Sequence, residues 1–401
     1  MEPEIAETSL KESATSAQLV IVGRLRRQLT GLMRIEVHEI VQQPDAVIVF
    51  RGEIYGDTEV AFEQISQRFA GVGYTAWLHD RPGGGHEVVA TKGVTERKPG
   101  RAWINVVLFL ATLFSVLYIG AGRALQDAGL ITETLSETDF LLMPLLRLHW
   151  GLPFAGTLLG ILLTHELSHY FVARRYGSPV SLPYFIPMPL SIIGTMGAVI
   201  VQRAPMRNRK ALFDIGIAGP LGGLIVAIPL LVLGLVLSTV GTTPPDVGSV
   251  LQEGNSLLYL GLKYLVFGRI LPSGGEDVWL HSVAFAAWVG LLVTMINLIP
   301  VGQLDGGHAA YALLGRRAWT LSYIAIGAMV AWGAWLMVND NDAGSFWMTW
   351  AFLNMMINRR HPLPLDDATK LGWRRIGLGL LVLVIFILLF MPSPLRVITV
   401  Q

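Results

Sequence analysis

Long stretches of mostly apolar residues run from residue 102 to near the end of the chain, and they constrain its fold more than any other feature. A helix of about 20 apolar residues crosses the hydrocarbon core of a bilayer. Of the 401 residues, 52% are hydrophobic and only 15% are charged. We therefore predict a polytopic α-helical membrane protein with about seven transmembrane helices. The predicted spans cover residues 102–122, 157–176, 211–240, 281–300, 318–338, 343–356 and 376–391.

The first hundred residues have a different composition and predict a small soluble α+β domain. Residues 1–17 lack apolar content, which is typical of disorder. Alternating and β-branched residues predict strands at 32–41, 46–55, 74–79 and 87–90, and apolar residues at helical spacing predict a helix at 58–70. We divide the chain into a disordered N-terminus (1–17), a soluble α+β domain (18–95), a basic linker (96–101), a membrane core (102–316) and C-terminal transmembrane helices (317–401).

The predicted span at 157–176 contains the sequence HELSH. His165 and His169 are four residues apart, so a helix places both imidazoles on one face, with Glu166 beside them. Two nitrogen ligands and an adjacent carboxylate suit zinc-dependent hydrolysis. A motif this short also occurs by chance on solvated helices, but ionisable side chains within an apolar span are costly and indicate function. Because the chain has no cysteine, His and carboxylate side chains must supply any metal ligands.

A second polar group follows the predicted span at 281–300, in the sequence NLIPVGQLDGG at 297–307. The spans at 157–176 and 281–300 both run inward, so their polar ends are expected at the same depth. Asp305 then supplies the third ligand that a catalytic zinc site requires, which leaves the fourth position for water. His308 is the rival ligand. Gly306 and Gly307 favour Asp305 because they let the backbone come close, but the sequence does not decide between the two on geometry.

Residues 178–206 do not follow the pattern of a simple span. Five prolines interrupt the stretch, and four of them precede a Gly-spaced, β-branched strand pattern. Non-helical backbone at membrane depth occurs only where protein or a water-filled cavity satisfies its polar groups. We predict a re-entrant β-like segment beside the metal, with an exposed strand edge at 194–202 to which an extended substrate adds. The alternative is a cytoplasmic loop lying on the membrane.

The distribution of basic residues predicts the topology of the chain. Positive charge accumulates on the cytoplasmic side of membrane proteins, and basic residues occur in the linker and at 174–175, 207–210 and 316–317. The polar, acidic N-terminus has neither a signal peptide nor an Arg-rich transit peptide, so we expect it to stay in the compartment of synthesis. The net charge of +1 gives no indication of nucleic-acid binding.

The motifs HELSH, GTMGAVI, FDIGIAGPLGG and NLIPVGQLDGG, in this order and on these spans, resemble the site-2 protease family of intramembrane zinc metalloproteases. The N-terminal domain, with FRGEIYGDTEVAFEQISQRF, is similar to the branch of ethylene-dependent gravitropism-deficient and yellow-green chloroplast proteins. The resemblance implies zinc (Zn²⁺) on His165, His169 and Asp305, Glu166 as the catalytic base, and Asn297 near the substrate backbone. The missing transit peptide points to a multi-pass protein of a bacterial inner membrane with a cytoplasmic N-terminus.

We therefore expect an intramembrane zinc metalloendopeptidase that cleaves membrane-anchored proteins within or next to their transmembrane segments, as in regulated intramembrane proteolysis. Its expected partners are the substrate protein and the lipid bilayer, with no nucleic acid. Glu166 is the expected catalytic residue, and Asn297, Gly194 and Gly197 are expected to bind substrate. One alternative is a transporter or metal-handling protein, which would disperse polar residues along several spans. The other is a catalytically silent relative that acts as a binding protein, against which the presence of all the catalytic residues argues.

Overall fold

The computed structural model describes residues 16–42, 46–81, 83–93, 100–131, 136–242, 249–339, 341–356 and 360–399. The chain divides into two compact units. One unit combines Met1–Lys98 with Pro205–Arg209 and Leu363–Lys370, and the other contains Pro99–Ala204, Lys210–Pro362 and Leu371–Gln401. The predicted disorder of residues 1–17 and the predicted linker at 96–101 fall largely outside the described residues.

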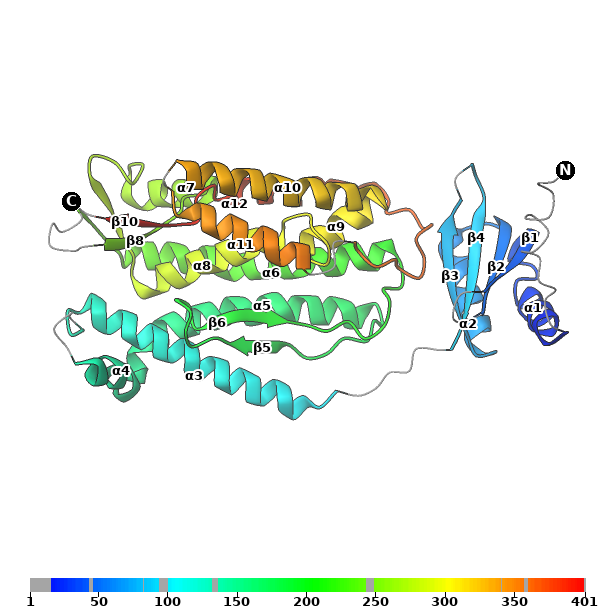
Figure 1. Cartoon of the computed structure of the whole chain (residues 1–401), viewed down its shortest axis with the longest axis horizontal. Coiled ribbons are helices and arrows are strands. Elements are labelled where there is room, and N and C mark those ends of the chain that lie inside the picture. The colour runs from blue at the N-terminus through cyan, green and yellow to red at the C-terminus, as the bar shows by residue number, and fades with distance from the viewer. Residues whose placement is uncertain are drawn as a thin grey trace, which may run out of the picture. The chain divides into compact units, whose positions relative to one another are not determined.

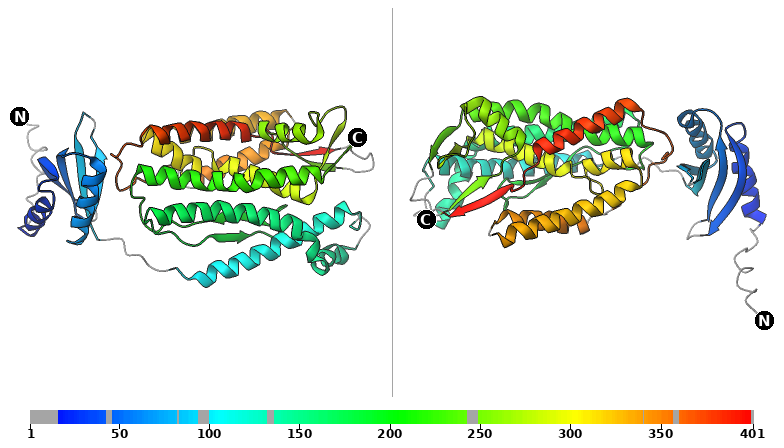
Figure 2. Two further views of the ribbon diagram at one scale, coloured as in Figure 1. Left: turned by 180° about the vertical axis from the view of Figure 1, so that it is seen from behind. Right: turned by 90° about the horizontal axis from the view of Figure 1, so that it is seen from above.

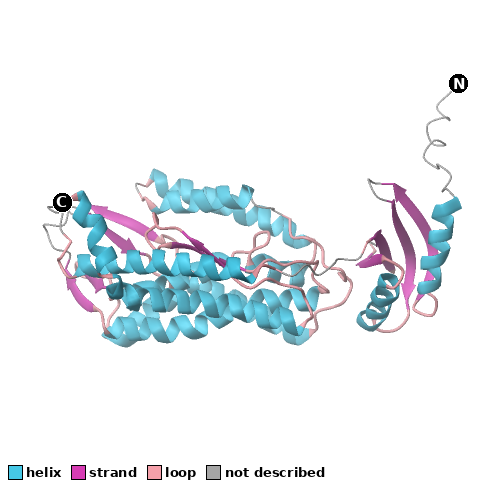
Figure 3. Cartoon of the chain, turned by 90° about the horizontal axis from the view of Figure 1, so that it is seen from below, coloured by secondary structure: helices cyan, strands magenta, loops and turns pink. Residues whose placement is uncertain are grey.

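The first unit is a four-stranded antiparallel sheet with two helices, which Figure 3 shows as magenta strands beside cyan helices. The strands β1 (Met33–Gln42), β2 (Ala46–Ile54), β3 (Tyr74–Asp80) and β4 (His86–Lys92) lie in the order β1-β2-β4-β3. The helices are α1 (Ser16–Gln28) and α2 (Thr58–Ala70). All four strands and α2 form where the sequence predicts them, which confirms a small N-terminal α+β region.

Helix α2 begins where its sequence supplies a cap, because the Asp57 carboxylate accepts hydrogen bonds from the amides of Glu59 and Val60 at 2.9 and 3.1 Å. Its Phe62, Ile65 and Phe69 then face the core at helical spacing. Helix α1 was not predicted from the sequence. Val22 and Leu25 of this helix, and Leu29 directly after it, belong to the same buried core at helical spacing and were the available signal.

Two short segments from much later in the chain complete this unit at strand β3. The Leu78 amide donates to the Leu365 carbonyl at 2.7 Å, and the Asp367 amide donates to the Leu78 carbonyl at 2.9 Å. The Leu365 amide donates in turn to the Met206 carbonyl at 2.8 Å. Main-chain pairing therefore extends the sheet with residues that lie next to apolar helices in the sequence. No pattern in the sequence predicted this pairing.

The second unit is mostly helical (Figure 1). Its helices are α3 (Ala102–Asp127), α4 (Glu137–Leu146), the 3₁₀ helix η1 (Leu148–Gly151), α5 (Leu152–Arg175), α6 (Arg209–Val236), α7 (Leu257–Phe267), α8 (Ser282–Asn297), α9 (Asp305–Leu314), α10 (Arg317–Val338), α11 (Ala343–Met356) and α12 (Trp373–Leu389). Its three antiparallel strand pairs are β5 (Tyr184–Pro187) with β6 (Thr195–Val199), β7 (Thr239–Thr242) with β9 (Glu276–Trp279), and β8 (Ser249–Glu253) with β10 (Leu395–Thr399).

By length and composition, three helices of the described residues are able to cross a membrane: α3, α6 and α10. A fourth candidate is the bent pair formed by Glu137–Leu146 and Leu148–Arg175, which is bent by 73° at the break. Helices also lie at the other predicted positions, but α8, α11 and α12 have only 16, 14 and 17 residues. The structure thus shows a mostly helical protein with three or four candidate spans, and it does not show seven.

Contacts between distant segments define the two ends of the helical unit. At one end, the C-terminal strand β10 pairs with β8, as Figure 2 shows. At the other end, the Arg375 guanidinium donates two hydrogen bonds to the Asp214 carboxylate at 2.8 and 2.7 Å, and the Tyr176 hydroxyl donates to the same carboxylate. The C-terminus of α5 and the N-terminal parts of α6 and α12 therefore meet at one end of this unit.

Candidate metal centre

Helix α5 carries the first part of the site. His165, Glu166 and His169 are all buried, between 4 and 6% exposed, on a helix whose other buried residues are almost all apolar. The two imidazole rings lie 4.9 Å apart between centroids, as expected for residues four apart on one helical face. The last turn of the helix carries Arg174 and Arg175, whose positive charges interact favourably with the helix dipole.

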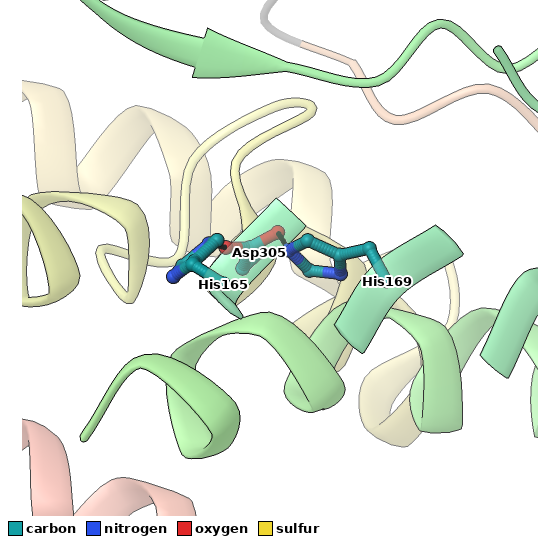
Figure 4. A group of neighbouring side chains, drawn as sticks. All are labelled: His165, His169 and Asp305. Carbon is teal, nitrogen blue, oxygen red and sulfur yellow. Dashed lines mark hydrogen bonds and ion pairs between the residues drawn. The ribbon is translucent and has the colours of Figure 1, made fainter. Parts of the chain in front are cut away.

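Asp305 reaches this pair from a different part of the chain. One carboxylate oxygen of Asp305 lies 3.1 Å from His165 Nε2, and the other lies 3.2 Å from His169 Nε2. Figure 4 shows the three side chains pointing toward one another. Their ligand atoms all lie within 4.8 Å of one another, and no other group of three or more His, Cys, Asp or Glu side chains of this kind occurs among the described residues.

Two glycines allow the chain to fold back so that Asp305 faces α5. A Cβ atom at Gly306 would lie 2.0 Å from the Leu298 carbonyl oxygen, and one at Gly307 would lie 2.4 Å from the Gly302 carbonyl oxygen. Any side chain at either position would therefore push apart the turn between α8 and α9. The sequence pattern favoured a glycine turn that contains Asp305, whereas the structure makes Asp305 the first residue of α9.

The donor set fits a zinc ion. Two imidazole nitrogens and one carboxylate oxygen are ligands that Zn²⁺ accepts, and three protein ligands are typical of catalytic zinc sites. The His169 Nδ1 lies 2.6 Å from the Ile215 carbonyl oxygen, which can only accept a hydrogen bond. Nδ1 therefore carries the proton, and Nε2 presents its lone pair toward Asp305 and the centre of the group. Such a carbonyl partner is common for metal-binding histidines.

Helix α6 packs against the site through glycine residues. A Cβ atom at Gly219 would lie 2.0 Å from His169 Nε2, and one at Gly223 would lie 3.3 Å from His165 Nδ1. A Cβ atom at Gly222 would meet the Ser168 hydroxyl at 2.1 Å. Small residues such as those at 218–223 let two helices approach closely. Here they allow α6 to lie directly against both histidines of the HELSH motif.

Glu166 lies next to the end of strand β6. Its carboxylate accepts a hydrogen bond from the backbone amide of Ile200, which follows β6 directly. Contacts of β6 with α5 and α3 keep the β5–β6 hairpin beside the motif helix (Figure 1). The strand predicted for this segment therefore forms, and it ends beside the Glu166 carboxylate.

The predicted substrate-binding residues lie at different places. Asn297, the last residue of α8, has its amide nitrogen 3.5 Å from His165 Nε2 and so lies at the cluster. Gly197 lies within β6 with a positive φ of 100°, and a Cβ atom added there would have no neighbour within 4 Å. Gly194 packs against α3, where its carbonyl accepts a hydrogen bond from the Ser115 hydroxyl at 2.6 Å. The structure thus brings Asn297, but not Gly194, to the metal-binding group.

His308, the rival ligand, is outside the group of convergent donors. Its Nδ1 lies 2.5 Å from Nε2 of His361, which lies between α11 and α12. His361 was not predicted from the sequence as a site residue. The available signal was a histidine in a short proline-containing stretch, HPLP, between two apolar segments.

The site combines two buried His side chains, four residues apart on an apolar helix, with a neighbouring Glu and an Asp from a second segment. This set of side chains is typical of a membrane-embedded zinc metalloprotease. Comparison with known proteins agrees with this class. Residues 153–338 match the model of peptidase family M50. This finding confirms the resemblance to site-2 proteases predicted from the motifs.

Three relatives are also similar to this chain over much of its length. The probable zinc metalloprotease EGY1, chloroplastic, of Arabidopsis thaliana is 28% identical over 376 residues, which cover 85% of this chain and 66% of the relative. The EGY2 protein of Oryza sativa subsp. indica is 28% identical over 88% of this chain and 63% of the relative. The EGY3 protein of the same subspecies is 26% identical over 75% of this chain and 50% of the relative.

The chain thus spans about half to two thirds of the length of these relatives. Their names place them in chloroplasts, so they give no support to the predicted bacterial inner membrane. No solved structure matches the chain significantly.

Proposed function

We propose that this protein is an intramembrane zinc metalloprotease that hydrolyses peptide bonds within or next to the transmembrane segments of membrane-anchored proteins. The observation that carries the proposal is the convergence of His165, His169 and Asp305, beside Glu166, among apolar helices. Burying His165, Glu166 and His169 among apolar residues costs several kcal/mol unless a ligand or partner compensates for it. The zinc metalloprotease names of the relatives agree with this assignment.

His165, His169 and Asp305 hold the zinc ion in this proposal, and Glu166 is the general base. A bound zinc ion supplies a Lewis acid that polarises the oxygen atoms it contacts. Glu166 takes a proton from the attacking water and then passes it to the amine that leaves the cleaved bond. Asp305 is 13% exposed at its side chain, so the group of ligands is enclosed but not fully sealed.

The β5–β6 hairpin is the proposed substrate platform. A carbonyl in a helical substrate is hydrogen-bonded and shielded, so the substrate must be extended before its peptide bond can be attacked. Addition of an extended segment along β6 would replace the lost main-chain hydrogen bonds. Gly197 leaves open space on this strand, and Ile200 connects its end to Glu166. Asn297 lies where its amide can contact the substrate backbone, whereas Gly194 acts by fixing the hairpin turn to α3.

We further propose that the chain crosses the membrane seven times, with α3, α5, α6, α8, α10, α11 and α12. We also propose that the domain divisions predicted from the sequence hold apart from the segments Pro205–Arg209 and Leu363–Lys370, which complete the first unit. Two observations support this topology. Strand β10, which follows α12, pairs with β8, which follows α6, so these two connections lie at one end of the helical unit. The contacts among Tyr176, Asp214 and Arg375 lie at the opposite end, where α5 ends. Both observations agree with alternating spans, and the basic residues put the N-terminal domain on the cytoplasmic side.

This topology predicts which positions an impermeant thiol reagent reaches in intact cells. The chain has no native cysteine, so single cysteines can be introduced at exposed positions. Cysteines at Asp127 and Arg269 should be labelled from outside, whereas cysteines at Glu63 and Arg174 should be labelled only after the membrane is permeabilised. Labelling of position 174 in intact cells would invert the proposed topology.

The proposed activity is tested with the purified chain and a single-span substrate reconstituted in liposomes. We expect cleavage within or beside the hydrophobic segment, located by mass spectrometry of the fragments. A zinc chelator should stop cleavage because the ligand group loses its ion, and added zinc should restore it. A chain that binds zinc and moves it across the liposome membrane, without cleaving the substrate, would support the metal-handling alternative and refute the proposal.

A further inference from the structure

The helix that carries Asp305 has little local support for its first turn. Helix α9 has only ten residues, and the preceding Leu304 offers no side chain to cap its free amide groups. Short helices depend on tertiary contacts for their stability. Because Asp305 is the first residue of α9, the position of its carboxylate depends on what holds this turn.

His308 provides a contact from this turn. It lies three residues after Asp305, so both side chains lie on the same side of α9. His308 Nδ1 lies 2.5 Å from His361 Nε2, and the two rings meet edge to face with centroids 4.8 Å apart. On the side toward α6, a Cβ atom at Gly216 would lie 2.8 Å from His308 Cβ, so His308 is held closely from that side as well.

The direction of the hydrogen bond follows from the partners of His361. His361 Nδ1 lies 2.5 Å from the Pro362 carbonyl oxygen, which can only accept. Nδ1 of a neutral His361 therefore carries the proton, and its Nε2 is an acceptor. His308 Nδ1 must then donate to it. These two hydrogen bonds, from His361 to Pro362 and from His308 to His361, fix the tautomer of both rings.

His361 has contacts besides that with His308. It is only 5% exposed, and its carbonyl accepts a hydrogen bond from Trp319 Nε1 of α10 at 3.2 Å. Its ring also stacks on Tyr311, farther along α9, with centroids 4.8 Å apart. A contact made by a fixed side chain restrains its partner more than one made by a mobile surface residue. His361 is therefore suited to act as an anchor for the first turn of α9.

We propose that His308 and His361 are positioning residues that hold the Asp305 carboxylate between His165 and His169 and thereby raise the zinc affinity of the site. The inference rests on the proposed function, because it requires Asp305 to be a zinc ligand. Neither residue contacts the metal or the substrate in this role. Their hydrogen bond acts on the orientation of one ligand.

The test compares variants that remove the hydrogen bond with variants that replace it. His308→Leu removes the donor, whereas His308→Asn keeps an amide nitrogen near the position of Nδ1. His361→Phe keeps the ring that stacks on Tyr311 but removes the acceptor, whereas His361→Gln offers a carbonyl oxygen in its place. Zinc affinity is measured by chelator competition on detergent-purified, metal-free protein, and the ligand geometry is followed by the absorption spectrum of the cobalt-substituted protein.

We expect His308→Leu and His361→Phe to weaken zinc binding about tenfold and to change the cobalt spectrum, as outer-shell partners of metal ligands do. His308→Asn and His361→Gln should restore most of the affinity. Trp319→Phe is the comparison variant, because it removes one contact that holds the His361 backbone but leaves the hydrogen bond between the two histidines. Its loss of affinity should therefore be smaller than that of His308→Leu or His361→Phe.

Three results would contradict the inference. Equal loss of affinity in Trp319→Phe would assign the effect to packing of the segment between α11 and α12. Loss in both His308 variants with none in the His361 variants would make His308 a ligand. Unchanged affinity in His308→Leu and His361→Phe, in a parent protein that binds zinc, would refute the positioning role alone. A parent protein that binds no zinc would instead refute the proposed function.

Discussion

Glu166→Gln is expected to abolish proteolysis while zinc remains bound. Gln has nearly the same shape as Glu but cannot take a proton from water, so the general base is lost and the three proposed ligands are kept. General acid–base groups contribute about 10²- to 10⁴-fold to enzymatic rates. We therefore expect kcat to fall by at least about 10²-fold. Cleavage of the reconstituted substrate and zinc content are measured on the same preparation.

A control variant separates loss of chemistry from loss of fold. Glu63→Gln, on the exposed surface of the N-terminal unit, removes a carboxylate far from the motif in the sequence and should leave both activity and zinc content unchanged. Full activity in Glu166→Gln would refute the protease assignment. Loss of zinc from the same variant would show that the carboxylate supports the metal rather than the proton transfer.

Asp305→Ala is expected to remove most of the zinc from the purified protein. The carboxylate lies 3.1 and 3.2 Å from the two Nε2 atoms, so its loss leaves two nitrogen ligands where a catalytic zinc site has three protein ligands. Since outer-shell partners alone affect metal affinity by about 10- to 100-fold, the loss of a direct ligand should exceed about 100-fold. The measurement is zinc content by elemental analysis and affinity by chelator competition.

His308→Ala is the matched comparison, because it alters a side chain on the same turn of α9 that the structure bonds to His361 instead. It should lower the affinity far less than Asp305→Ala. The reverse order would move the third ligand to His308, the alternative that the sequence left open. An equal and near-complete loss of zinc affinity in both variants would indicate that α9 as a whole fails to form.

The sequence by itself determined the features that arise from local periodicity. The spacing of His165 and His169 places both on one face of any helix that contains them, whatever surrounds it. The alternating residues of the N-terminal unit likewise specify the strands and α2, because each strand buries one face. The proline-interrupted stretch before residue 200 predicted a strand where a helix could not continue, and β6 forms there.

The tertiary structure alone decided which distant residues meet. Asp305 comes 136 residues after His169 in the sequence (305 − 169), and its approach depends on the fold of the turn that Gly306 and Gly307 permit. No local pattern indicated that His308 would meet His361 or that Leu365 would pair with β3. The small residues at 218–223 did not indicate that Gly219 would lie against His169. Such contacts depend on how whole helices and strands pack against one another. The periodicity of a single sequence shows only which face of each helix or strand is apolar.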